Sequence, residues 1–339
     1  MPLCIRCQDR GIIKCPATGE PYCRECFFAD FEHRIHQTII EADVLKPGHT
    51  IAIGASGGKD STVLAYVLKL LNERHNYGLK LVLLSVDEGI SGYRDDSLAT
   101  VKANKTDYGL DLLIVSYQEL FNGWTMDKIV QKVGLGSNCT FCGILRRTAL
   151  ELGARRLGVD FVATGHNADD IAETVLMNLL RGDRARISSC TSFATMDQLG
   201  LAVPRIKPFK YTFEKEIVMY AYFKKLLYFS TECTYAPGAF RGHVRSFIKD
   251  LEAISPRYIL GIIKSGDHFR LMKQSEISTS DNTNTITTKV VPCRTCGCMA
   301  TPSEGVCKAC AIVQALESDN SLSVLGSSRK YQGCTSHSK

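Results

Sequence analysis

The sequence predicts an α/β protein with a doubly wound parallel sheet, flanked by two small zinc-ribbon domains. Two observations predict this fold class. Between residues 50 and 180, short apolar runs alternate with longer helical patterns, which is typical of strands joined by helical crossovers. Near each end of the chain stand two closely spaced CxxC pairs, a pattern typical of structural zinc sites.

The elements of the expected sheet follow in order along the chain. A helical pattern at 31–41 precedes a turn at Lys46–His49, which contains Pro47 and Gly48. Apolar runs predict buried strands at 50–55, 79–86, 111–116 and 161–164. Helices are expected at 61–72, 93–108, 143–157, 169–180 and 213–227. In a doubly wound sheet the functional site lies at the carboxyl ends of the strands.

The composition is that of a soluble globular protein: of 339 residues, 45% are hydrophobic and 22% are charged. No apolar window approaches the ~18 residues of a membrane span, and the N-terminus lacks a signal-peptide pattern. We therefore expect a cytoplasmic protein with no membrane partner. The net charge of +6 is concentrated in residues 141–273, which carry +7. Such a region suits a polyanion, although a solvated basic surface explains the charge equally well.

The cysteines indicate metal binding. Fifteen cysteines cannot form a disulfide framework in a reducing compartment, so metal or thiol chemistry is favoured. The terminal pairs are spaced to close two tetrahedral zinc sites. The expected ligands are Cys4, Cys7, Cys23 and Cys26 in the first site, and Cys293, Cys296, Cys307 and Cys310 in the second. Cys15 and Cys298 are nearby thiols that can substitute. Each zinc contributes roughly 10–16 kcal/mol, enough to order a segment that has no core of its own.

This interpretation divides the chain into five parts. They are an N-terminal zinc ribbon at 1–30, an α/β nucleotide-binding domain with a helical C-terminal part at 31–272, a linker at 273–291, a C-terminal zinc ribbon at 292–316 and a disordered tail at 317–339. The linker includes Ser275–Thr288, a stretch rich in Ser, Thr and Asn that lacks periodicity.

The loop after the first strand carries the clearest functional signal. It places glycines, two serines and Lys59 between a buried strand and a helix, where backbone amides can surround a phosphate. It is not a Walker A loop, because Gly54 is one position too close to Lys59 and Asp60 follows the lysine. A plain glycine-rich turn is the structural alternative. The predicted ATP-binding residues are Ala55, Ser56, Gly57, Gly58, Lys59, Asp60 and Ser61 of this loop, with Ser85, Arg146 and Gly165.

Carboxylates follow two further strands. Asp87 and Glu88 come after the second strand, and Asp169 and Asp170 come after the fourth. At the edge of a phosphate site such groups can hold Mg²⁺, which stabilises the charge on leaving pyrophosphate. Acidic residues in a first helical turn also stabilise the helix, and the two roles are compatible. Asp169 and Asp170 are our catalytic candidates, together with Cys142.

A third group of cysteines lies in the middle of the chain. Cys139 and Cys142 stand just before an expected helix with Arg146 in its first turn, a setting that lowers thiol pKa. With the distant Cys233 they can hold a [4Fe–4S] cluster that keeps one iron position open. A redox disulfide or persulfide carrier, a zinc site, and an ordinary buried Cys233 remain as alternatives.

These motifs together resemble those of eukaryotic 2-thiouridine synthetases in the ATP pyrophosphatase (PP-loop) superfamily. The resemblance covers the chain to about residue 317 and rests on Gly54–Leu64, Val86–Ile90, Cys139–Gly143, Gly165–Asp170 and Phe240–His243. It implies that Cys139, Cys142 and Cys233 hold a [4Fe–4S] cluster. Prokaryotic relatives have a lysine where Arg146 stands, and the two cations do not bind phosphate identically.

The resemblance further implies 2-thiolation of the wobble uridine in lysine, glutamate and glutamine tRNAs. ATP would adenylate the C2 oxygen, and sulfur from a thiocarboxylated ubiquitin-related modifier would displace AMP. The implied partners are tRNA, that modifier and a second, non-identical subunit, with a homodimer as a further possibility. Two other hypotheses compete: an adenylating, lysidine synthetase-like tRNA ligase, which needs no cysteine trio, and a non-catalytic zinc-ribbon RNA-binding scaffold.

Overall fold

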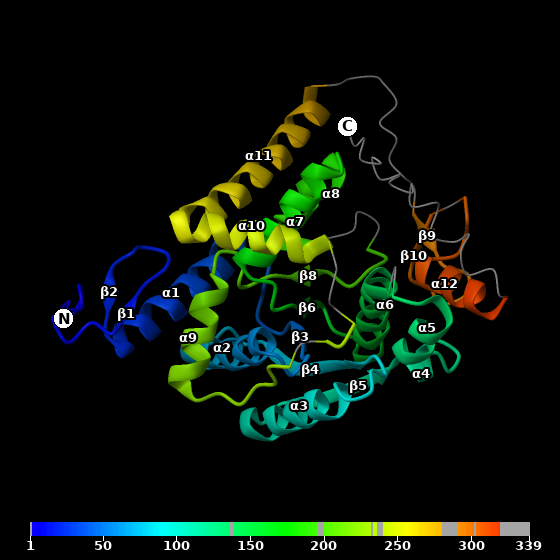
Figure 1. Ribbon diagram of the computed structural model, residues 1–339, viewed down its shortest axis with the longest axis horizontal. Helices are drawn as coiled ribbons and strands as arrows, with labels where there is room; N and C mark the ends of the chain where they lie inside the picture. The colour runs from blue at the N-terminus through cyan, green and yellow to red at the C-terminus, as the bar shows by residue number, and fades with distance from the viewer. Residues whose placement is uncertain are drawn as a thin grey trace, which may run out of the picture.

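The computed structural model describes residues 2–135, 138–195, 200–231, 233–235, 240–279, 290–301 and 303–318. Its centre is a six-stranded sheet in the order β5-β4-β3-β6-β8-β7, parallel except where β7 pairs with β8 (Figure 1). The strands are β3 (Thr50–Gly54), β4 (Lys80–Asp87), β5 (Asp111–Ser116), β6 (Phe161–Ala163), β7 (Ala194–Thr195) and β8 (Arg205–Ile206). The predicted doubly wound sheet is confirmed, and β8 and β7 extend it at one edge.

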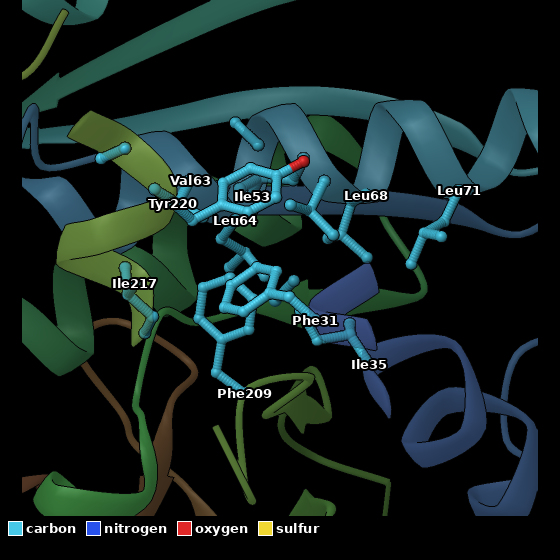
Figure 2. Packing of buried hydrophobic residues seen from close by; sticks show 14 of the residues in the cluster. Phe31, Ile35, Ile53, Val63, Leu64, Leu68, Leu71, Phe209, Ile217 and Tyr220 are labelled. Carbon is cyan, nitrogen blue, oxygen red and sulfur yellow. The ribbon is translucent and has the colours of Figure 1, made fainter. Parts of the chain in front are cut away.

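Alternate residues of β3 face opposite layers of helices. Ile51 and Ile53 join one buried cluster, while Ala52 joins another, as the two-residue period of a strand requires. The first cluster receives α1 (Arg24–Ala42), α2 (Lys59–His75), α3 (Arg94–Tyr108) and α9 (Glu214–Lys224). The second receives α4 (Tyr117–Leu120), α5 (Met126–Val133), α6 (Asn138–Leu157) and α12 (Lys308–Glu317). Figure 2 shows the aromatic centre of the first cluster, where Phe31, Phe209 and Tyr220 meet.

Four further helices form a separate group with its own apolar cluster. They are α7 (Ala168–Leu180), α8 (Arg184–Cys190), α10 (Phe240–Ile254) and α11 (Arg257–Thr279). Ile171 and Val175 of α7 pack with Ile248 of α10 and Ile263 of α11. Figure 1 shows these helices gathered beyond the β6–β8 side of the sheet. Because α7 follows β6 after a short loop, this group of helices lies at the carboxyl edge of the sheet, where the functional site is expected.

The two cysteine-rich segments each form a small hairpin and pack on the main domain. The N-terminal hairpin pairs β1 (Ile13–Lys14) with β2 (Pro21–Tyr22), and the C-terminal one pairs β9 (Val291–Pro292) with β10 (Met299–Ala300). Ile13 and Tyr22 belong to the same buried cluster as Phe31, and Leu316 belongs to that of α6. Figure 1 places the segments at opposite ends of the molecule.

Several sequence-based boundaries need correction. The helix expected from 143 begins at Asn138, so Cys139 and Cys142 lie inside it, and the helix expected from 31 begins at Arg24. The linker predicted at 273–291 is wrong for 273–279, which α11 includes, and for Val291, which belongs to β9. The disordered tail predicted from 317 is wrong for Glu317, the last residue of α12. Residues 280–289 and the tail from 319 lie outside the described residues. Within the described ranges, no helix combines the length and apolar character needed to cross a membrane.

Candidate functional site

A tight loop joins β3 to α2 at the carboxyl edge of the sheet. The hydroxyls of Ser56 and Ser61 lie 3.1 Å apart, and Ser61 donates to the Gly58 carbonyl at 3.0 Å. Gly57 has a φ of +75°, and a Cβ added there would lie 2.6 Å from the Ser97 carbonyl oxygen. No side chain caps the first turn of α2. Its amides are therefore available to a phosphate group.

Gly57→Ala is expected to weaken ATP binding about tenfold and to lower the free energy of unfolding by about 1–3 kcal/mol. Alanine at this position must adopt a left-handed backbone conformation, and its methyl group must displace Ser97. Gly92→Ala is the matched control, because Gly92 has the same φ of +75° but its Cβ would meet nothing within 4 Å. Calorimetry with a non-hydrolysable ATP analogue and urea denaturation measure both effects. Equal losses in the two variants would contradict the close packing of the loop against Ser97.

The loop lysine is held by two carboxylates. Lys59 Nζ lies 3.2 Å from Asp60 and 2.9 Å from Glu214 at the start of α9. Lys249 Nζ also lies 3.1 Å from Glu214. Although burial opposes it, these two lysines lower the pKa of Glu214. Glu214 and Lys249 were missed by sequence reasoning, because neither stands in a motif near the loop.

The neighbouring aspartates at the start of α7 have different surroundings. Asp169 is buried, accepts from the Glu214 amide at 2.8 Å and pairs with Lys249 Nζ at 2.8 Å. Asp170 forms a capping box with Asn167, whose side-chain amide donates to Asp60 at 3.1 Å. Burial raises the pKa of Asp60, and the Asp170 carboxylate adds to this against the opposing charge of Lys59. Asp60 and Asp170 therefore form a pair of repelling carboxylates that a Mg²⁺ ion would stabilise.

Basic residues of α10 fix this acidic helix end in place. Arg241 and Arg245 both pair with the buried Glu173, and Arg241 also reaches Asp170 at 3.4 Å. Their spacing of four residues, continued by Lys249, puts all three on one face of α10. That periodic basic stripe in the sequence was the signal that could have predicted the docking of α10 on α7.

The remaining predicted nucleotide residues border the loop. The Ala55 amide donates to the Leu84 carbonyl at 2.9 Å, and Ser85 is buried in β4. A Cβ at Gly165 would lie 3.0 Å from the Asp60 backbone, so only glycine allows the strand ends to approach this closely. The structure thus brings these residues together, and their contact with ATP stays a prediction.

The central cysteines come together around the first turns of α6. Cys139 Sγ lies 3.7 Å from the Tyr235 carbonyl, which also accepts from Asn138 at 3.0 Å. Cys142 lies close enough to Cys233 for the second thiol to raise its pKa. The expectation of a lowered pKa is wrong for Cys142, because burial outweighs the Arg146 charge and raises it. Cys142 lies near Cys233, and Cys139 contacts Tyr235 two residues further on, but among the described residues the three sulfurs do not form a group within 4.8 Å as the terminal cysteines do. Three thiols from these two segments are the kind of donor set that an iron–sulfur cluster uses.

Arg146 belongs to the cysteine side of the site. Its guanidinium donates to Glu88 Oε1 at 2.7 Å and to Cys142 Sγ at 3.4 Å. The hydroxyl of Tyr117 donates to the Cys142 carbonyl at 2.9 Å and lies 3.9 Å from its sulfur. Arg146 therefore orients Cys142, and its predicted contact with ATP stays a prediction.

A short segment links the cysteines to the loop. The Phe229 amide donates to the Gly57 carbonyl at 2.8 Å, and the Phe229 ring packs edge-on against Tyr93 at 5.2 Å. Cys233 follows Phe229 by four residues, a path that spans at most about 14 Å even when extended. The chain path therefore keeps Cys233 within about 14 Å of the contact between Phe229 and the loop.

Both terminal groups of four cysteines have the geometry of a metal site. Within each group all four sulfurs lie within 4.8 Å of one another, and tetrahedral zinc separates its thiolate ligands by about 3.8 Å. Cys15 lies outside the first group, 3.5 Å from Glu216, and Cys298 lies outside the second. The donor sets therefore fit zinc. The expected pairs, rather than Cys15 or Cys298, form the groups.

Known proteins are similar to this chain in both sequence and fold. A family model described as a PP-loop domain matches residues 29–251. Cytoplasmic tRNA 2-thiolation protein 1 from Drosophila sechellia is 55% identical over 331 residues, with 97% of this chain and 91% of that protein covered. The protein of the same name from Laccaria bicolor is 56% identical over 315 residues, with 93% and 85% covered.

A solved structure agrees with these relatives. The U34-tRNA thiolase NcsA from Methanococcus maripaludis with its [4Fe–4S] cluster is 30% identical and superposes with a TM-score of 0.75, covering 93% of this chain and 97% of that one. The motif order, the sheet-edge site and these matches agree. This chain belongs to the PP-loop domain family and, within it, to the cytoplasmic tRNA 2-thiolation protein 1 family.

Proposed function

We propose that this chain is a tRNA sulfurtransferase that 2-thiolates the wobble uridine of cytosolic lysine, glutamate and glutamine tRNAs at the expense of ATP. The observation that carries this proposal is the short chain path from Gly57 of the phosphate-type loop through Phe229 to Cys233, which lies near Cys142. The names of the relatives and the structural similarity to a U34-tRNA thiolase support this proposal.

The first step activates an oxygen. The uridine C2 oxygen attacks the α-phosphorus of ATP, an O–P bond forms, and the bond to pyrophosphate breaks. The amides of α2 hold the departing phosphates, together with Lys59 once its ammonium group leaves Asp60 and Glu214. Asp60 and Asp170 would hold Mg²⁺, which screens the phosphate charge. Anticodon-loop bases are already unpaired, so their presentation costs little.

The second step replaces the oxygen with sulfur. A sulfur nucleophile attacks C2, and the C2–O bond breaks with departure of AMP. Cys139, Cys142 and Cys233 would hold a [4Fe–4S] cluster, whose open iron position supplies a place for sulfide. Arg146 orients Cys142 and contributes positive charge beside the entering sulfur.

The reaction also needs a sulfur donor, and the chain works with a second subunit. The sulfur comes from a ubiquitin-related modifier that ends in a thiocarboxylate, and a second, non-identical subunit assists the chain. The name of the relatives places them in the cytoplasm, and we propose the same compartment here. The terminal cysteine groups would hold two structural zinc ions.

The test supplies anaerobically purified chain and its second subunit with substrate tRNA, Mg-ATP and a thiocarboxylated donor. We expect release of AMP and pyrophosphate that depends on the tRNA, and 2-thiouridine by mass spectrometry. A tRNA without a wobble uridine is the matched control. AMP release with an amidated base would favour a lysidine-type ligase, and no AMP release at all would favour a scaffold.

A further inference from the structure

A group of cations surrounds the strand ends between the loop and the cysteines. Burial lowers the pKa of His166, the third residue after β6, to about 4, and the charges of Lys207, Arg241, Arg205 and Arg147 add to this effect. Arg241 is neutralised by Glu173 and Asp170. The other three form no ion pair with any described carboxylate, since Glu151 near Arg205 and Asp267 near Lys207 pair with Arg155 and Lys210. We call Arg147, Arg205 and Lys207 the cationic cluster.

The cationic cluster is held by backbone carbonyls instead. Arg205 donates to the Arg147 carbonyl at 2.7 Å, and Arg147 donates to the Gly143 carbonyl at 2.9 Å. Lys207 donates to the Cys190 carbonyl at 2.6 Å. These bonds fix the directions of the side chains, and Glu151 and Asp267 compensate the charges of Arg205 and Lys207 only in part. Each guanidinium and the ammonium keeps further N–H donors for a ligand.

Cations next to the cationic cluster form ion pairs with carboxylates, whereas the three members of the cluster form none with a described carboxylate. Arg155 pairs with Glu151 at 3.0 Å, and Lys210 pairs with Asp267 at 3.1 Å. By contrast, burial lowers the pKa of Lys207 to about 8, and Lys207 is only 8% exposed. Holding unpaired like charges together is costly. An anion bound among them would remove that cost.

The location of the cationic cluster identifies the anion. On one side, Gly165 and His166 continue β6 toward Asp60 of the loop. On the other side, Arg147 bonds Gly143, the residue after Cys142. The loop already has Lys59 and the N-terminus of α2 for the triphosphate of ATP. The cluster therefore faces the part of the substrate that lies between the nucleotide and the thiols.

We propose that Arg147, Arg205 and Lys207 bind a backbone phosphate of the RNA substrate, next to the nucleotide whose base reacts. This inference rests on the proposed function. The phosphates of ATP offer similar chemistry and are the competing source. Phosphate contacts position nucleic acid without reading its sequence. The cluster thus sets where the uridine stands between the loop and Cys142.

Arg205→Gln and Arg147→Gln test this proposal in the full chain. We expect each to weaken binding of substrate tRNA about five- to tenfold and to reduce the magnitude of the salt slope of log K by about 1, because one phosphate contact is lost. The KM for ATP should change less than twofold. Lys102→Gln is the control, since Lys102 is exposed on α3 and loses the same charge elsewhere.

Fluorescence anisotropy at several salt concentrations gives tRNA affinity, and pyrophosphate release gives the KM for ATP. A raised KM for ATP with unchanged tRNA affinity would assign the cluster to the nucleotide and overturn the proposal, as would unchanged values for both. If wild-type protein neither binds tRNA nor releases AMP with it, the proposed function itself fails. Arg147 is exposed, so its variant keeps the test open should Arg205→Gln unfold.

Discussion

Cys142→Ala is expected to reduce formation of 2-thiouridine by at least about a thousandfold, a loss of roughly 4 kcal/mol of transition-state stabilisation. Cys142 is the thiol that Arg146 and Tyr117 orient, and Cys233 lies near enough to raise its pKa. Its loss removes one of the three proposed cluster ligands and leaves the Arg146 guanidinium without its sulfur partner. Mass spectrometry of nucleosides from substrate tRNA measures the product.

Cys190→Ala is the control for this loss of a thiol. Its sulfur donates to the Ile187 carbonyl at 3.2 Å within α8 and packs in the apolar cluster of α7, whereas Cys142 and Cys233 pack in that of α6. Thiolation should therefore continue. Iron and sulfide analysis of anaerobically purified protein separates cluster chemistry from persulfide chemistry. About four irons per chain in wild type and a marked loss in Cys142→Ala are expected for a cluster. Undiminished 2-thiouridine in Cys142→Ala would remove the cysteine from the mechanism.

Cys310→Ser is expected to lower bound zinc from two ions to one per chain and to unfold the C-terminal segment. A structural zinc of this type contributes roughly 10–16 kcal/mol, and the segment has only a two-stranded hairpin and α12 besides. Ile312 and Leu316 of α12 share a buried cluster with Leu145 of α6. Loss of the zinc should therefore loosen α6, the helix that carries Cys139 and Cys142.

Hydrogen exchange and atomic absorption measure these effects. Faster exchange is expected in α12 and in the face of α6 beneath it, while α2 on the opposite layer keeps its protection. Cys298→Ala is the matched control, since Cys298 is buried nearby but lies outside the group of four sulfurs. Retention of both zinc ions in Cys310→Ser, or loss of one in Cys298→Ala, would contradict the assignment of ligands.

The sheet was predictable where strands are long enough to leave an apolar run. β4 spans Lys80–Asp87 and pairs in parallel on both sides, and such strands are continuously hydrophobic. β8 has two residues, Arg205 and Ile206, so it leaves no run to recognise. The early start of α6 was hidden because Asn138 is a poor helix former. Its side chain instead bonds the Tyr235 carbonyl from a distant segment.

The candidate site was predictable where a spacing carries the chemistry. The loop around Lys59 and the paired cysteines are local patterns, and the structure gathers them as expected. Glu214 and Lys249 come from helices far along the chain, and only the fold brings them to Lys59 and Asp169. The pKa of Cys142 also required the fold, because local charge predicts lowering while burial raises it.

Asp169 and Asp170 have different partners, and this difference changes how much negative charge a metal ion would meet. Successive residues of a helix point about 100° apart, so the phase of α7 sends one carboxylate to Lys249 and the other toward Asp60. The first is already neutralised within the protein. Asp170 has only the longer contact with Arg241, which Glu173 shares. A count of the acidic residues after β6 therefore overstates the negative charge offered to a cation, and the two aspartates are not interchangeable.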